Sequence, residues 1–462
     1  MGVIIIYTKN KETIKSFILS FLVISSLVLT ANIWFVKELW SKDYNSFLYS
    51  FQNIFNFNDT YEDVVYKSEY SPVFVGITLN SKRTIAYIGS ENYNDFFSVA
   101  DSIMKNISKE GSYLEISDDD FSAVHKTNSM IIKFANDTEL KVFLKNADVL
   151  PDTQTMPVSD SVVINIFDTS TKYLYFHDSI SNKNYRISVK YSPVNTKKVT
   201  DITNNAQSLY YAFEVSLHKQ TDNVERILFE NFIPIEINDT TVMKLDASPI
   251  IYNNAKNSPY DPLFKAFNIT KNSARASYID KDNVINFIEK YSTFKIHKNG
   301  LYIYETNRDQ AGINLSKNNR NERDEAIWFI NELYRNAAPD STAILKLDSV
   351  NNDKEITTYT FNYITDNGVL YFSDNSPAAT MEVSNGIIIS CKQHLLTIKP
   401  TANFGKISGM LETYNNMYQA DIAKDLKIKN MFPANIYYPY GSNVGWVALL
   451  SDNSVYVAEN PN

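Results

Sequence analysis

Few residues in this 462-residue chain have the type and spacing that catalysis requires. Ser102 and Lys105 match the S-x-x-K pattern of wall-active serine enzymes, in which the lysine assists removal of the serine proton. Two S-D-N triplets, at residues 373–375 and 451–453, match a second motif of those enzymes. However, no K-T-G follows, and Ser102 falls in the middle of a predicted helix. We therefore predict no catalytic residue and do not expect an enzyme.

The residues that could bind a metal or a cofactor are equally sparse. No two of the five histidines have metal-ligand spacing on a helix: His125, His177, His218, His297 and His394. Cys391 follows an apolar run and is predicted to be buried, and the three aspartates from Asp118 are typical of a solvated cap or turn. Asp280 and Asp282 resemble the start of a calcium loop, but Ile285 stands where that loop needs glycine. With no phosphate-binding glycine motif either, we predict no metal site and no cofactor.

Composition excludes further classes of function. A net charge of −8 argues against nucleic acid as a partner, because neutralising phosphates requires clustered Lys and Arg. One cysteine excludes a disulfide framework, and 12 glycines leave little material for phosphate-binding loops. A mean hydropathy of −0.26 excludes a protein with many membrane spans. The length predicts two to four domains.

One segment near the N-terminus could cross a membrane. Residues 17–36 carry no charge, and about 20 such residues suffice for a helix to span the bilayer core. Lys9, Lys11 and Lys15 precede the segment, and basic residues stay on the cytoplasmic side. We therefore expect a cytoplasmic tail (1–15), a transmembrane helix (16–36) and an extracellular remainder, in a cell-membrane protein that spans the bilayer once. The alternative is a cleaved signal peptide, with residues 29–31 as the cleavage site.

The predicted membrane helix has one side of small residues. At 100° per residue, one arc contains Ser16, Ser20, Ser26, Thr30 and Ala31. The pairs Ser16/Ser20 and Ser26/Thr30 have the small-xxx-small spacing that lets helix backbones approach closely. We interpret this arc as a face for a partner helix, although small residues are also common in such helices by chance.

The remainder of the chain is predicted to be α+β, with antiparallel sheets and segregated helices. Hairpins are expected at 73–79 with 84–88 and at 294–298 with 301–305, and Asn-Gly pairs at 367–368 and 385–386 predict further hairpin turns. Helices are expected at 91–108, 138–146, 283–291, 322–337 and 407–423. We expect an N-terminal α+β domain (44–155), a central strand-rich domain (156–310) and a C-terminal α+β domain (311–462).

Three stretches of the sequence resemble one family. Residues 26–34 (SLVLTANIW) resemble the membrane anchor of the YycH (WalH) family, although Ala31 stands where relatives often have a bulkier residue. The stretch from FKAFN at 264–268 to LYIY at 301–304 is similar to the family's central segment. The closing VGWVAL at 444–449 fits the end of the family. The order of tail, anchor and large extracellular part is similar as well.

The resemblance implies a regulatory role without catalysis. Members of the family act with the related protein YycI on the sensor histidine kinase WalK of a two-component system that controls cell-wall metabolism in Gram-positive bacteria. They do so largely through their membrane helices, and the last two of their three extracellular domains resemble YycI. The alternative is a tethered extracellular protein that binds or processes the cell wall. Aromatic side chains exposed in a concave surface would support that alternative.

Overall fold

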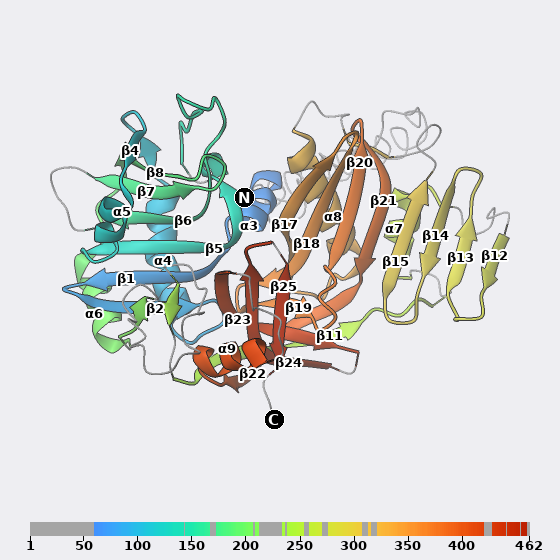
Figure 1. The fold of residues 1–462 in the computed structure, drawn as a ribbon. Helices are drawn as coiled ribbons and strands as arrows, with labels where there is room; N and C mark the ends of the chain where they lie inside the picture. Colours follow the sequence, from blue (N-terminus) through green and yellow to red (C-terminus); the bar gives the residue numbers. More distant parts are fainter. Residues whose placement is uncertain are drawn as a thin grey trace, which may run out of the picture. The chain divides into compact units, whose positions relative to one another are not determined.

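The computed structural model describes residues 60–142, 144–166, 172–206, 208–211, 233–235, 238–253, 258–269, 276–306, 313–315, 321–419, 427–439, 441–452 and 454–459. These residues belong to the compact unit Tyr61–Asn462, apart from Thr60. Two large sheets and the helices that cover them make up this unit (Figure 1). The predicted class, α+β with antiparallel sheets, is confirmed.

The first sheet has eight strands, in the order β2-β1-β5-β6-β7-β8-β3 with β4 beside β8. All its pairings are antiparallel. Its strands are β1 (Pro72–Leu79), β2 (Lys82–Tyr87), β3 (Ser108–Lys109), β4 (Leu114–Ile116), β5 (Ser129–Glu139), β6 (Val158–Asn165), β7 (Tyr173–Asp178) and β8 (Lys183–Lys190).

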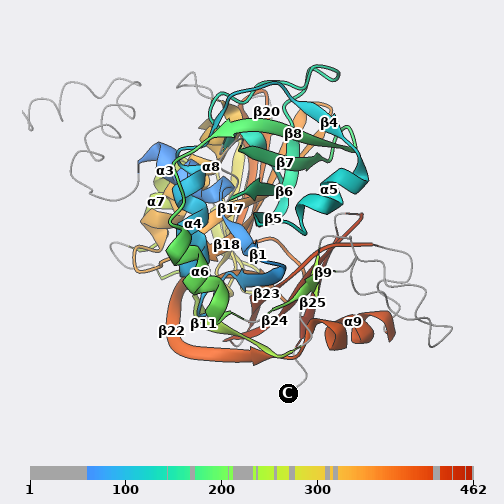
Figure 2. The same ribbon diagram turned by 90° about the vertical axis from the view of Figure 1, so that its left-hand side faces the viewer.

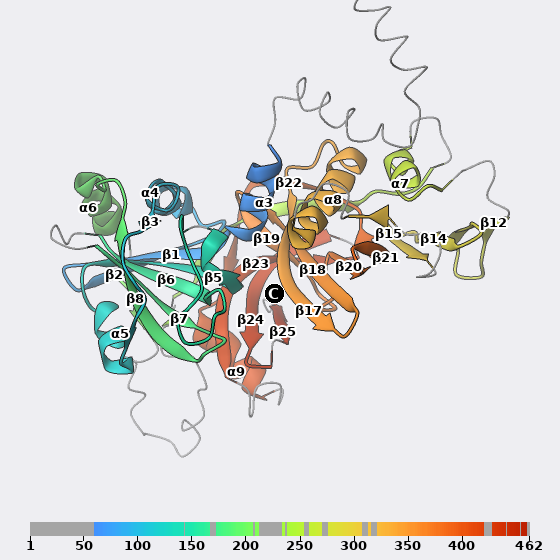
Figure 3. The ribbon, with the colours of Figure 1, turned by 90° about the horizontal axis from the view of Figure 1, so that it is seen from above.

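Helices cover both faces of the first sheet. Helices α4 (Tyr93–Met104) and α6 (Thr196–Asn205) lie on one face, and α5 (Asp118–Val124) lies on the other, as Figures 2 and 3 show. The buried residues of α4 include Phe96, Ala100 and Ile103, whose spacing places them on one side of the helix. That side packs against the sheet, because α4 contacts β1 and β2.

The second sheet has thirteen described strands, and most of them form the path β12-β13-β14-β15-β21-β20-β18-β19-β23-β24-β25. In addition, β16 pairs with β21 and β17 pairs with β18, and only β19 and β23 run parallel among the described pairs. The strands are β12 (Ala276–Ile279), β13 (Ile285–Ile288), β14 (Ser292–Ile296), β15 (Leu301–Thr306), β16 (Ile313–Asn314), β17 (Ile344–Asp353), β18 (Ile356–Thr365), β19 (Gly368–Phe372), β20 (Ala379–Ser384), β21 (Ile387–His394), β23 (Ile428–Tyr438), β24 (Gly441–Leu450) and β25 (Val455–Glu459).

The remaining elements surround the second sheet. Helix α8 (Glu322–Ala337) contacts α7 (Asp261–Ala266), β17 and α3 (Tyr61–Glu69), which is the first described helix. Two short ribbons consist of β11 (Thr240–Pro249) with β22 (Leu396–Ile407) and of β9 (Tyr210–Tyr211) with β10 (Pro234–Ile235). The other described elements are α9 (Met410–Gln419) and the 3-10 turn η1 (Leu140–Val142).

Several predicted elements are confirmed in detail. Helix α8 has the predicted bounds, because the Asn321 side chain caps it and acidic residues fill its first turn. The hairpins β1–β2 and β14–β15 pair as predicted. The turn before β21 has Asn385 at φ 50° and Gly386 at φ 75°, the left-handed conformations that favour an Asn-Gly pair.

Two predicted helices are wrong, and two others are shorter. The segment 283–291 contains strand β13, because Asn283 adopts a turn conformation (φ 60°) and Phe287 then pairs with Phe294 across a hairpin. The segment 138–146 continues β5 to Glu139, and its other described residues contain the turn η1 in place of an α-helix. Helix α4 ends at Met104, because β3 follows, and α9 begins at Met410, because β22 extends to Ile407.

Strands on either side of two expected domain boundaries pair within one sheet, and the division into domains stays a prediction. The boundary after residue 155 lies between β5 and β6, which pair with each other in the first sheet. The boundary after residue 310 lies between β15 and β16, which both pair with β21 in the second sheet. Strand pairing therefore joins residues from either side of both positions.

The two sheets share one of the two hydrophobic cores. This shared core includes Tyr87 of β2 and Trp446 of β24, whose rings meet edge-to-face at 5.8 Å. The other core lies between the second sheet and the helices α7 and α8, where it buries Phe264, Ile330 and Phe361. Burial of these aromatic side chains stabilises both cores.

Candidate functional site

The predicted partner face lies outside the described residues. This applies to all five of its positions, Ser16, Ser20, Ser26, Thr30 and Ala31, and to the whole expected membrane helix. Among the described residues, no helix combines the length and the apolar character that crossing a membrane requires. The membrane helix and its face therefore stay predictions.

The S-x-x-K residues are directed to local partners. The Ser102 Oγ donates a hydrogen bond to the Val99 carbonyl at 2.7 Å, and the Lys105 Nζ forms an ion pair with Asp101 at 2.7 Å. Both side chains belong to the surface of α4. In this arrangement the lysine and the serine hydroxyl do not contact each other as a base and a nucleophile would.

The described histidines and the cysteine contribute to no group of side chains that could hold a metal ion. His125 is buried, and its Nδ1 lies 2.9 Å from the Phe121 carbonyl oxygen, while burial lowers the pKa of its imidazole to about 4. Cys391 is buried as predicted, and burial raises the pKa of its thiol to about 12, so it is protonated and unreactive at neutral pH. His218 lies outside the described residues. In the described part of the chain, no three His, Cys, Asp or Glu residues are placed to hold a metal ion.

The run of aspartates serves as a helix start. The Ser117 Oγ accepts a hydrogen bond from the Asp120 backbone N–H at 3.1 Å, and the three acidic residues fill the first turn of α5. Negative charge is favourable there because it faces the positive end of the helix dipole. The expectation of a cap or turn is confirmed.

The most concentrated polar contacts join α3 to the rest of the unit. Ser68, in the last turn of α3, donates a hydrogen bond from its hydroxyl to the Leu345 carbonyl at 2.9 Å. The same hydroxyl accepts the Leu347 backbone N–H at 3.0 Å. Both backbone groups belong to β17, just before the bulge at Leu347/Ser349. One buried hydroxyl thus satisfies two groups of the strand that α3 packs against.

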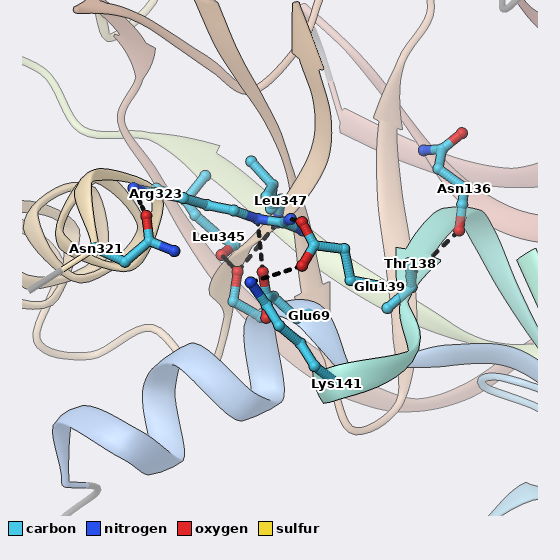
Figure 4. A network of polar contacts seen from close by, with 10 residues as sticks. Glu69, Asn136, Thr138, Glu139, Lys141, Asn321, Arg323, Leu345 and Leu347 are labelled. Carbon is cyan, nitrogen blue, oxygen red and sulfur yellow. Dashed lines mark hydrogen bonds and ion pairs between the residues drawn. The ribbon is translucent and has the colours of Figure 1, made fainter. Parts of the chain in front are cut away.

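Arg323 connects α3 with two further elements (Figure 4). Its Nε lies 2.7 Å from the Glu69 Oε1 at the end of α3, and its Nη1 donates a hydrogen bond to the Glu139 Oε1 at 2.9 Å. The Lys141 Nζ forms a second ion pair with Glu139 at 2.6 Å. We call Ser68, Glu69, Glu139, Lys141 and Arg323 the α3 dock. It connects the first described helix to β5, η1 and the start of α8.

Burial makes the α3 dock sensitive to charge. The Glu69 side chain is 7% exposed, compared with 18% for Arg323 and 25% for Glu139. Loss of water around Glu69 raises the pKa of its carboxyl to about 7, although the nearby Arg323 lowers it. Breaking a buried ion pair by removing one partner costs about 3–5 kcal/mol, because the other charge stays buried without compensation.

Two further polar contacts join the sheets near the α3 dock. The Asn136 amide donates to the Asp348 Oδ1 at 2.5 Å, and the Asn430 amide donates to the Phe134 carbonyl at 2.8 Å. Beside Asp348, the Lys346 side chain is buried, and its Nζ has no hydrogen-bond partner among the described residues. Burial lowers the pKa of this lysine to about 8.

A polar cleft lies on the first sheet, between α4 and α6. Its volume is about 360 Å³, and its lining residues include Asn92, Asp95, Lys197, Asp201 and Asn205. Phe96, the aromatic residue among those that line the cleft, is buried, so the cleft has no exposed aromatic side chain among its described residues. The cleft is therefore a weak candidate for a ligand site. The α3 dock, whose side chains contact one another, is the more distinctive polar feature.

The sequence did not indicate the α3 dock. Arg323 stands in an E-R-D-E stretch typical of a helix start, and Glu69 ends a short helix with mixed charges. Glu139 and Arg323 are 184 positions apart, so their pairing depends on the tertiary fold. The only local signal is that β5 ends in polar residues next to Lys141.

No known protein-family model matches the chain, and none of the curated proteins matches its sequence. Among solved structures, the chain is similar to the crystal structure of YycH from Bacillus subtilis, with a TM-score of 0.53. The likeness covers 85% of this chain and 96% of that chain at 13% sequence identity. The described unit therefore has the YycH fold.

Proposed function

We propose that this protein is a membrane-anchored, non-enzymatic regulator of a sensor histidine kinase of WalK type that controls cell-wall metabolism. It acts together with a YycI-like membrane protein. The observation that carries the proposal is the YycH fold, which extends over 96% of the compared YycH chain. The uncharged segment 17–36 and the stretches that resemble the YycH family support it from the sequence.

The proposed mechanism relies on contact between membrane helices. The small residues of the predicted partner face let a second helix approach closely, as Ser20 and Ser26 illustrate. Helix α3 is the first described element after this segment, and its dock contacts both sheets through β5 and β17. In this mechanism, α3 is the first helix of the extracellular part and links the rest of that part to the anchor.

A bacterial two-hybrid assay with the full-length chain tests the helix contact. Ser20→Ile combined with Ser26→Ile introduces branched side chains on the partner face, so we expect a loss of association with the WalK-type kinase or with the YycI-like protein. Leu22→Ile combined with Leu29→Ile is the matched control on the other side of the helix and should retain association. Undiminished association of the serine variant would refute the partner face.

A second candidate function is that of a tethered extracellular protein that binds or processes the cell wall. The cleft between α4 and α6 is the place where such binding would occur, because acidic, basic and amide side chains line it. Binding of isolated wall fragments to the purified protein, and its loss in Lys197→Ala combined with Asp201→Ala, would support this function over kinase control.

A further inference from the structure

We propose that the α3 dock is a proton-controlled contact, which tightens when Glu69 binds a proton and loosens when Glu69 loses it. The inference concerns the attachment of α3 to the two sheets and does not rest on the proposed kinase partner. It starts from the number and placement of charges around Glu69, as seen in Figure 4.

When Glu322 and Asp324 of α8 are counted with the α3 dock, carboxylates outnumber cations around Glu69. Glu69 and Glu139 share the single guanidinium of Arg323, and Lys141 contacts only Glu139 among these carboxylates. Asp324 lies near Glu69 and adds to the repulsion. Three segments supply the charged or titratable groups that face Glu69 or its partners. Helix α8 supplies Glu322, Arg323 and Asp324. The segment of β5 and η1 supplies Glu139 and Lys141, and β18 supplies the Tyr359 hydroxyl. One added proton therefore relieves both repulsion and desolvation.

The burial of Glu69 determines the pH range of this effect. Burial is the largest cause that raises the pKa of Glu69 to about 7, and the charges of Asp324 and Glu139 raise it further. Arg323 and Lys141 act in the opposite direction but do not cancel the effect of burial. In a released α3, Glu69 would face water and return to its ordinary pKa of 4.5.

The sign of the effect follows from proton linkage. Because the docked state has the higher pKa, it binds more protons than the released state between pH 4.5 and about 7. Docking is therefore favoured at low pH and weakens as the pH rises through 7. For a carboxyl with these two pKa values, the equilibrium constant for docking falls about tenfold between pH 6 and pH 8.

The neighbouring titratable groups do not oppose this change. Burial also raises the pKa of Asp324, which acts in the same direction as Glu69. The Tyr359 hydroxyl donates to the Glu322 Oε1 at 3.0 Å, and burial raises the pKa of this tyrosine well above its ordinary value. The Arg323 guanidinium stays charged throughout. A proton that enters the dock in this range therefore binds to a carboxylate.

Hydrogen exchange of the full-length chain in detergent tests the inference. We expect the protection of the amides of Tyr61–Glu69, corrected for the intrinsic pH dependence of exchange, to fall about tenfold from pH 6 to pH 8. Glu69→Gln carries a permanently uncharged side chain of the same shape and should remain protected at both pH values. Glu115→Gln, in an exposed pair with Lys183, is the matched control and should behave as the wild type.

A second measurement needs no substitution at Glu69. The Tyr61 ring lies 5.4 Å from the Trp328 ring of α8, so Trp328 fluorescence reports whether α3 is docked. Trp34 and Trp40 are replaced by phenylalanine, and the signal of the remaining Trp446 is subtracted with a Trp328→Phe variant. We expect the Trp328 fluorescence to change between pH 6 and pH 8 in the direction of release. A protection pattern at α3 that does not change with pH, or that changes equally in Glu69→Gln, would overturn the inference. So would a Trp328 signal without a transition between pH 6 and pH 8.

Discussion

Two contacts between the sheets of this protein use opposite chemistry. At the α3 dock, Arg323 binds two carboxylates from α3 and β5 in a partly buried position. At the second contact, the Tyr87 ring of β2 meets the Trp446 ring of β24 inside the shared core. An apolar contact has no charge to titrate and therefore no direct dependence on pH, whereas a buried ion network depends on the charge of every member. The fold therefore combines one contact whose strength does not change with pH and one whose strength does.

The largest effect is expected at the apolar contact. Trp446→Ala should lower the free energy of unfolding by about 3–5 kcal/mol, because it removes a ring that is 1% exposed and leaves a cavity. Urea unfolding at pH 6 and at pH 8 measures this, and the loss should be equal at the two pH values. A loss that differed strongly between them would show that the apolar contact is not independent of charge.

The next effect is expected at the α3 dock. Arg323→Ala should cost about 3 kcal/mol at pH 8, because Glu69 and Glu139 lose their shared cation while Glu69 stays buried. At pH 6 the cost should be smaller, since Glu69 is then largely protonated. Lys105→Ala, which breaks the exposed pair with Asp101, is the control and should cost less than about 1 kcal/mol at either pH. Equal losses for Arg323→Ala at both pH values would argue against the titration of Glu69.

A smaller effect is expected where α3 contacts β17. Ser68→Ala removes the hydroxyl that accepts the Leu347 N–H and donates to the Leu345 carbonyl, so we expect a loss of about 1–2 kcal/mol. Chemical denaturation measures the loss, which should not depend on pH. Ser98→Ala, on the exposed side of α4, should be nearly neutral in comparison. If the two variants were equally stable, Ser68 would not hold α3 on the strand.

At pH 7, the smallest effect is expected at Lys346. Because burial lowers its pKa to about 8 from an ordinary 10.5, the folded protein binds fewer protons than the unfolded chain between these values. Wild-type stability should therefore rise with pH in that window, and Lys346→Met should remove the rise and change stability at pH 7 by about 1 kcal/mol or less. Denaturation from pH 7 to pH 10 checks this. A rise that persisted in the variant would contradict the assignment to Lys346.

Local patterns predicted much of the fold. The spacing of Ile327, Ile330 and Tyr334 predicted α8 to the residue, and Asn-Gly pairs predicted hairpin turns. The helix expected at 283–291 was wrong because the apolar residues of a short hairpin strand can also match helical spacing. Cross-strand pairing with Phe294 decided the outcome, and a local pattern does not contain that information.

The candidate site was less accessible to sequence reasoning. Ser102 and Lys105 form a motif that is visible in the local sequence, but in the structure each side chain bonds to a neighbouring residue of the same helix end. The residues of the α3 dock come from three distant segments, and neither Glu69 nor Arg323 stands out from an ordinary charged helix end. Only the packing of α3 against α8 and β17 brings them together.

The most direct test of the proposed function replaces residues 16–36 with an unrelated membrane span and leaves the rest of the chain unchanged. The output of the WalK-type kinase is then measured in cells with a reporter of its target genes, and immunoblotting verifies equal amounts of both proteins in the membrane. If regulation requires the partner face, the chimera should lose control of the kinase. Full control by the chimera would contradict regulation through the membrane helix.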